Sequence, residues 1–130
     1  MNTHMSTNKD LERIRGAAQA LHGAISDAAA KRGDAIKADL TAVERKAKSI
    51  TESVKATIGM QTESTAQKRL KEAVANLEAV QKHAAEALQN SGQAFNTSIR
   101  QTVADARTSV QKLSEAVAAV RSATFTKTGK

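Results

Sequence analysis

The sequence contains no cysteine, proline, tryptophan or tyrosine, and phenylalanine occurs only at Phe95 and Phe125. Without cysteine, the chain cannot form disulfide bonds, use a thiol nucleophile or bind a metal through thiolates. Without proline, no residue is obliged to interrupt a helix. So few aromatic residues also leave little material for an ordinary apolar substrate pocket. These absences disfavour a disulfide-stabilised domain and most kinds of enzyme.

Long apolar runs are missing as well. No segment approaches the roughly 20 apolar residues that are needed to cross a bilayer. The first ten residues, MNTHMSTNKD, lack the apolar stretch of a secretory signal. We therefore expect a cytoplasmic protein without a transmembrane segment, and the absence of cysteine is compatible with that location.

The residues that are present favour helices. The chain has 130 residues, which suits one domain, and 40% of them are hydrophobic, about half of these being alanine. Together with abundant Lys, Glu and Gln, this composition indicates an all-α fold. Alanine buries little apolar area, at about 25 cal/mol per Å². A lone monomer would be marginally stable, so we expect a homo-oligomer.

Apolar residues recur at steps of three and four, which places them on one face of an amphipathic helix. In the first half, this stripe comprises Leu11, Ile14, Ala18, Leu21, Ile25, Ala28, Ile36, Leu40, Val43, Ala47, Ile50, Val54 and Ile58. In the second half, it comprises Leu70, Val74, Leu77, Val80, Ala84, Leu88, Phe95, Ile99, Val103, Ala106, Val110, Leu113, Val117 and Val120. Between Leu88 and Val110 the steps often sum to eleven, a repeat that suits a nearly straight helix.

Alanines within the stripe predict where helices approach each other closely, because small side chains allow short distances between helix axes. The candidates for close contact are Ala18, Ala28, Ala47, Ala84 and Ala106.

The clearest interruption of the helical pattern is a turn at residues 59–64. Gly59 suits the left-handed position that follows a helix, and Ser64 with Gln67 fits a capping box that begins the next one. Weaker breaks occur at Gly33–Asp34 and at residues 90–92, where Asn, Ser and Gly follow one another.

Two all-α architectures fit these breaks. The first is a long antiparallel helical hairpin, kinked at Gly33 and Gly92, whose exposed seam requires self-association into a bundle. The second is an up-and-down four-helix bundle monomer that folds at all three breaks. We favour the hairpin, because a glycine within a helix costs only about 1 kcal/mol and the stripe resumes after each glycine with a small phase error.

The expected domain organisation is simple. Residues 1–8 form an N-terminal tail, residues 9–122 form a single all-helical domain with its turn at 59–64, and residues 123–130 form a basic C-terminal tail.

No catalytic, cofactor-binding or metal-binding residues emerge from the sequence. A carboxylate-bridged metal site in a helical bundle needs a Glu three residues before a His, and none of His4, His22 and His83 has one. We expect His22 and His83 to be solvated or half-buried. Serine and threonine are scattered without a nucleophile elbow or a phosphate-binding loop. We therefore expect no enzymatic activity and no cofactor.

The net charge of +7 favours acidic partners. Seven basic residues, together with two apolar ones, lie near the 59–64 turn and form our candidate partner-binding site: Arg45, Lys46, Lys48, Lys55, Ile58, Met60, Lys68, Arg69 and Lys71. An alternative reading is a solvated surface with helical ion pairs such as Glu44–Lys48 and Lys68–Glu72.

The function that we expect is that of a self-associating scaffold, adaptor or amphipathic surface coat, whose partner is an acidic protein, an anionic lipid or a granule surface. The alternative is a small basic nucleic-acid- or nucleoid-associated protein. The alanine-rich, cysteine-free amphipathic helices resemble those of phasins, which coat polyester storage granules. The eleven-residue steps resemble those of late-embryogenesis-abundant proteins. Neither resemblance rests on a motif, so no residue role is carried over.

Overall fold

Four helices make up the structure, a computed structural model that describes residues 3–30, 34–61 and 63–128, with side chains over 9–30, 36–61 and 63–122. They are α1 (Thr3–Ala29), α2 (Asp34–Met60), α3 (Ser64–Gln89) and α4 (Gly92–Thr128). The all-α prediction is confirmed.

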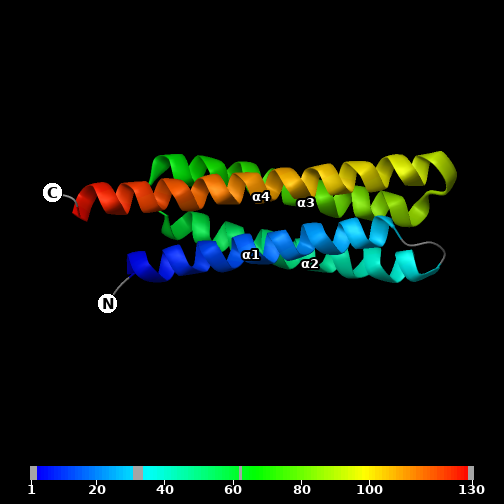
Figure 1. The fold of residues 1–130 in the computed structure, drawn as a ribbon, viewed down its shortest axis with the longest axis horizontal. Coiled ribbons are helices and arrows are strands. Elements are labelled where there is room, and N and C mark those ends of the chain that lie inside the picture. The colour runs from blue at the N-terminus through cyan, green and yellow to red at the C-terminus, as the bar shows by residue number, and fades with distance from the viewer. Residues whose placement is uncertain (1–2, 31–33, 62, 129–130) are drawn as a thin grey trace.

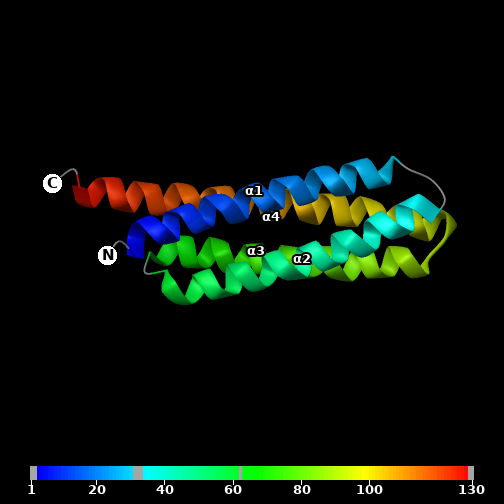
Figure 2. The same cartoon turned by 90° about the horizontal axis from the view of Figure 1, so that it is seen from below.

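The helices run alternately up and down and lie side by side as a bundle (Figures 1 and 2). Helix α1 packs against α2 and α4, and α3 packs against the same two helices. Within the described parts of the chain, the Cα atoms of the diagonal helix pairs are more than 8 Å apart. The turn between α2 and α3 lies at the same end of the bundle as the start of α1 and the end of α4 (Figure 1). This is the four-helix alternative. The long hairpin is wrong, because α1 folds back along α2 instead of continuing into it.

Each helix buries one narrow seam in which steps of three and four residues alternate. In α2 the buried positions are Ile36, Leu40, Val43, Ala47, Ile50, Val54 and Thr57. In α3 they are Ala66, Leu70, Ala73, Leu77, Val80, Ala84 and Ala87. The alternation is the a/d pattern of coiled coils. All five alanines expected at close helix contacts are fully buried.

The phase of the seam explains why the hairpin does not form. Continuing the three-four alternation of α1 beyond Ala28 would place the next seam positions at 32, 35 and 39, but the seam of α2 begins with Ile36 and Leu40. The same one-residue shift separates α3 from α4, since continuation from Ala87 predicts 98 and 101 whereas Ile99 and Thr102 carry the seam. One residue is about 100° of rotation. An unbroken helix would therefore turn half of its seam away from the core.

The seam of α4 corrects the eleven-residue reading. Its main positions are Ile99, Thr102, Ala106, Ser109, Leu113, Ala116 and Val120, which follow a seven-residue repeat. Thr102 and Ser109 are fully buried, and their hydroxyls donate to the backbone carbonyls of Ser98 and Ala106, each at 2.7 Å. Counting only apolar residues missed them, because a hydroxyl that bonds within its own helix can be buried at little cost.

The turn between α2 and α3 lies where the sequence places it, but its chemistry differs. Gly59 is helical and α2 continues to Met60, so Gly59 is not a left-handed cap. Glu63, and not Ser64, is the N-cap of α3: its carboxylate accepts a hydrogen bond from the backbone N–H of Ala66 at 2.8 Å. The side chain of Gln67 donates to the backbone carbonyl of Gln61. Glutamate has a longer side chain than the usual N-cap residues, so the capping-box motif predicted the N-cap one residue too late.

Of the two weaker breaks, the one at the start of α4 contains a glycine in the left-handed conformation. Gly92 has φ of +59° and is the one residue with positive φ in the described parts of the chain. Gly33 lies outside the described residues, and α2 begins at Asp34 beside it. Helical backbone extends from Thr3 and up to Thr128, into both segments that were expected to be tails.

Replacing Gly92 by alanine tests the break directly. A Cβ would meet nothing within 4 Å, so the expected cost is the left-handed backbone alone, about 1–2 kcal/mol of unfolding free energy. Gly23→Ala is the matched control, since Gly23 is helical, exposed and free of neighbours within 4 Å. That control should gain about 0.5–1 kcal/mol. Urea unfolding followed by circular dichroism measures both, and a stabilising Gly92→Ala would instead indicate a continuous helix.

Candidate partner-binding surface

All nine predicted site residues lie on α2 and α3. Seven are exposed, namely Arg45, Lys46, Lys48, Lys55, Met60, Lys68 and Lys71. Ile58 is half-buried and packs against the core, whereas Met60 is 51% exposed and is the one exposed large hydrophobic side chain among those described. The nine residues do not form a single cluster, because the helices present them in different directions.

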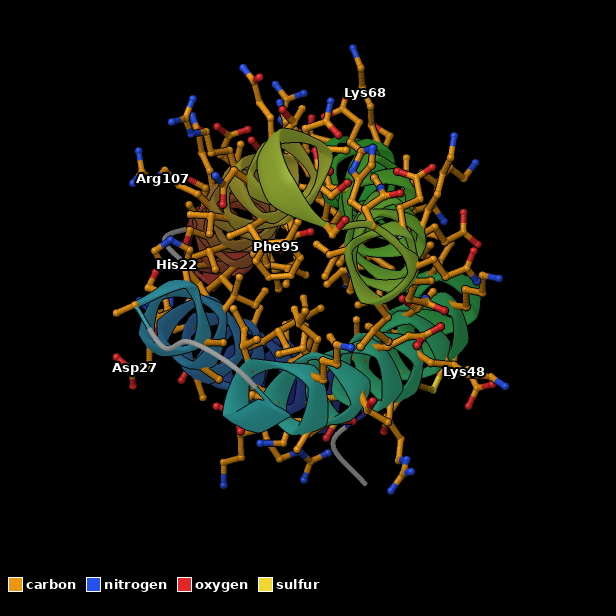
Figure 3. The ribbon with its side chains drawn as sticks, turned by 90° about the vertical axis from the view of Figure 1, so that its right-hand side faces the viewer. His22, Asp27, Lys48, Lys68, Phe95 and Arg107 are labelled. Carbon is orange, nitrogen blue, oxygen red and sulfur yellow. The ribbon has the colours of Figure 1, made fainter. Side chains whose placement is uncertain are left out.

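Four of the lysines share the side of the bundle formed by α2 and α3. Lys55 lies 3.3 Å from Glu78 of α3, so this face of α2 is turned toward α3, and Lys48 lies on it seven residues earlier. By the same spacing, Lys71 shares the α2-facing side of α3 with Glu78. Lys68 lies three residues before Lys71, so the two are neighbours on the surface of α3. Figure 3 shows Lys48 and Lys68 pointing outward from α2 and α3 in different directions. We call Lys48, Lys55, Lys68 and Lys71 the α2–α3 lysine surface.

Lys46 faces the other way. It lines a shallow groove between α1 and α2, together with Ala24, Asp27, Asp39, Ala42 and Val43. Two carboxylates in this groove offset the lysine charge. Lys46 therefore does not add to the α2–α3 lysine surface.

Arg69 is engaged inside the molecule. Its guanidinium lies 3.0 Å from Glu72 on the same helix and 2.8 Å from Glu115 of α4, and Lys112 of α4 lies 3.5 Å from Glu72. These four side chains form an ionic network that joins α3 to α4. A guanidinium with two carboxylate partners is a structural group, so the prediction that Arg69 lies at a free binding tip does not fit its contacts.

The network changes the acidity of one carboxylate. The hydrogen bond from Arg69 is the largest cause that holds the pKa of Glu72 below its ordinary value. Desolvation opposes it, and the charges of Lys112 and Arg69 lower the pKa further. A carboxyl group whose pKa is lower in the folded than in the unfolded state binds more protons when unfolded. Its contribution to stability is therefore full at neutral pH and disappears as the pH falls through the folded-state pKa.

Glu72→Gln should reveal this contribution as a difference that depends on pH. We expect the variant to melt below the wild type at about pH 7 and to approach it as the pH falls through the folded-state pKa, below which the carboxyl group is protonated in both states. Thermal unfolding over a series of pH values, with Glu52→Gln as an exposed control without an ion pair, provides the measurement. A difference that stays constant with pH would contradict the role given to the network.

A second polar contact across α3 and α4 was not anticipated from the sequence. Nδ1 of His83 lies 2.7 Å from Oδ2 of Asp105, and both side chains are largely buried, at 21% and 24% exposure. The sequence indicated only that His83 would be solvated or half-buried. The pairing could not be inferred because it depends on the register between two helices, and the residues are 22 positions apart.

Among the described side chains, a larger fraction of the acidic ones than of the basic ones forms ion pairs. Six described carboxylates lie within 4.0 Å of a basic nitrogen: Asp10, Glu12, Glu72, Glu78, Asp105 and Glu115. By contrast, most described basic side chains have no such partner within the described part of the chain: Lys9, Arg15, Lys37, Arg45, Lys46, Lys48, Lys68, Lys71, Lys82, Arg100 and Arg107. The side chains that remain outside these ion pairs are thus mostly basic.

Within the described residues, none of the helices combines the length and the apolar character of a membrane span. Among the same residues, no three His, Cys, Asp or Glu side chains are grouped so that they could hold a metal ion.

Comparison with known proteins gives no family assignment. Neither the protein-family models, nor the curated proteins, nor the solved structures contain a match to this chain.

Proposed function

We propose that this chain is a non-enzymatic helical adaptor that binds an acidic partner protein through the α2–α3 lysine surface. The observation that supports the proposal most is that the carboxylates of α3 and α4 near this surface form ion pairs within the bundle. Glu72 and Glu115 are engaged with Arg69 and Lys112. Glu78 is paired with Lys55, so these three acids do not neutralise the other lysines of the surface. Complementary charge of this kind steers partners and increases association rates.

Three exposed residues of this surface have no carboxylate partner within the described structure: Lys48, Lys68 and Lys71. Glu52 is also exposed on α2 and moderates the charge without cancelling it. Lysine is a flexible point charge that accommodates carboxylates in varied geometry. An acidic protein segment is therefore a suitable partner, and no deep pocket is required.

Two other expected roles receive less support from the fold. Self-association was expected because a hairpin would leave its seam exposed, but the four helices cover their seams within one chain. An amphipathic coat requires an apolar surface that can contact the coated material. Met60 is the one large hydrophobic side chain among the described residues that is exposed, so coating would require the bundle to open.

A double charge reversal, Lys68→Glu with Lys71→Glu, tests the proposal. Arg69 is left unchanged, because reversing it would disrupt the contacts with Glu72 and Glu115. With poly-L-glutamate as the acidic probe, we expect binding at low salt to weaken at least tenfold, equivalent to about 1.4 kcal/mol. The melting temperature should stay near that of the wild type, since both lysines are exposed and unpaired.

The matched control reverses two exposed basic residues of another helix, Arg100→Glu with Arg107→Glu. The change in net charge is the same, so a surface-specific interaction predicts a much smaller loss of poly-L-glutamate binding. Equal losses in the two variants would show that only net charge matters and would refute a defined lysine surface.

A further inference from the structure

The opposite side of the bundle, formed by α1 and α4, presents arginines instead of lysines. Arg100 and Arg107 are exposed on α4 and have no carboxylate partner within the described structure. They are seven residues apart and so share one face of the helix, about 10.5 Å from each other along its axis. Arg121, two further heptads along, contacts Glu12 of α1. That contact fixes the arginine row on the side of α4 next to α1.

The acids of α4 are turned toward the other neighbour. Asp105 pairs with His83 and Glu115 pairs with Arg69, both on α3. Helix α4 is therefore divided lengthwise, with its carboxylates neutralised against α3 and its arginines on the α1 side. Figure 3 shows Arg107 on the same side as His22 of α1 and across the bundle from Lys48.

Beside these arginines, the surface of α1 carries two glycines, which have no side chains. Gly16 follows Glu12 by four residues, and Gly23 follows by a further seven, so both lie on the face that turns toward Arg121. Both glycines are exposed, and a Cβ at either would meet nothing within 4 Å. Packing inside the bundle therefore gives no reason for glycine, although each costs about 1 kcal/mol relative to alanine in a helix. They leave room for an extended ligand to approach Arg107.

The chemistry of this surface favours phosphate. A guanidinium binds phosphate oxygens through two parallel hydrogen bonds and is more weakly hydrated than an ammonium group. The described exposed residues of α1 and α4 include no large apolar side chain, which disfavours insertion into a membrane. They include no Trp or Tyr, and Phe95 is half-buried against the core, which disfavours stacking on single-stranded bases.

We propose that the α1–α4 arginine surface, consisting of Arg100 and Arg107, binds the phosphate backbone of double-stranded nucleic acid. The two residues are about 10.5 Å apart along α4, so their guanidinium groups can contact different phosphates of one duplex. Contacts with phosphates alone carry no base readout. Binding is thus independent of sequence and falls steeply with salt, with a logarithmic slope of about 0.9 per phosphate neutralised. This proposal uses different residues from the lysine surface and does not depend on it.

Fluorescence anisotropy with a labelled DNA duplex of about two helical turns, over a series of salt concentrations, tests the proposal. The double variant Arg100→Gln with Arg107→Gln should bind at least tenfold more weakly at about 0.1 M salt and lower the salt slope by about 1.8, two phosphate contacts. The matched control, Lys68→Gln with Lys71→Gln, removes the same charge from the α2–α3 lysine surface and should change duplex affinity less than threefold. A single strand of equal length should bind more weakly than the duplex.

Several results would overturn the proposal: no duplex binding by the wild type, equal losses in the two double variants, or preference for the single strand. Tighter binding to vesicles of anionic phospholipid than to the duplex would also overturn it. None of these results bears on binding of poly-L-glutamate to the α2–α3 lysine surface, so the two proposals fail separately. Urea unfolding of both variants confirms that any loss is local, because neither pair of side chains has an ion-pair partner to lose.

Discussion

The alternation of three- and four-residue steps along each helix is the constraint on which the rest of the bundle depends. Because only two positions in seven face the core, the other positions are left for charged and small residues, and their direction follows from the seam. Alanines such as Ala18 and Ala84 are fully buried within it, which keeps neighbouring helix axes close. The identity of each outer surface, lysine-bearing or arginine-bearing, is therefore fixed by the same register that builds the core.

Polar contacts then distinguish the helix pairs. The pair α3–α4 carries both the network around Glu72 and the contact between His83 and Asp105. The pair α2–α3 has the exposed bridge from Lys55 to Glu78 and a hydrogen bond from Gln81 to Thr51. Helix α1 has the contact between Glu12 and Arg121 but also buries Nε of Arg15 and Nε2 of His22 without a hydrogen-bond partner in the described structure. Unpaired buried groups cost about 1–3 kcal/mol each, so α1 is held mainly by its apolar seam.

Much of the helical content and most of the core could be predicted from the sequence, because apolar periodicity is a local property. Leu11, Leu40, Leu77 and Leu113 are all fully buried, as expected. The choice between hairpin and bundle failed because a one-residue phase shift was treated as small, although it rotates the seam by about 100°. Thr102 and Ser109 were missed because their burial depends on hydrogen bonds to their own helix.

The candidate site was predictable only in part, for a related reason. Sequence alone shows that Lys68, Arg69 and Lys71 are neighbours, but it cannot show which carboxylate lies opposite each of them. Helix register gives Arg69 two acidic partners and leaves Lys68 and Lys71 exposed. The division of arginines and lysines between opposite sides of the bundle likewise requires knowing which helices are adjacent.

The shift of the seam by one residue at both junctions has an evolutionary and engineering consequence. Ile36 and Ile99 each lie one position beyond the place that an unbroken seam would give them. Deleting a single residue before each would align the seams of α1 with α2 and of α3 with α4. The same amphipathic segments would then suit two long helices with an open apolar edge, which would need a second chain to cover it. This closed bundle therefore differs by two single-residue deletions from a sequence whose natural architecture is an intermolecular assembly.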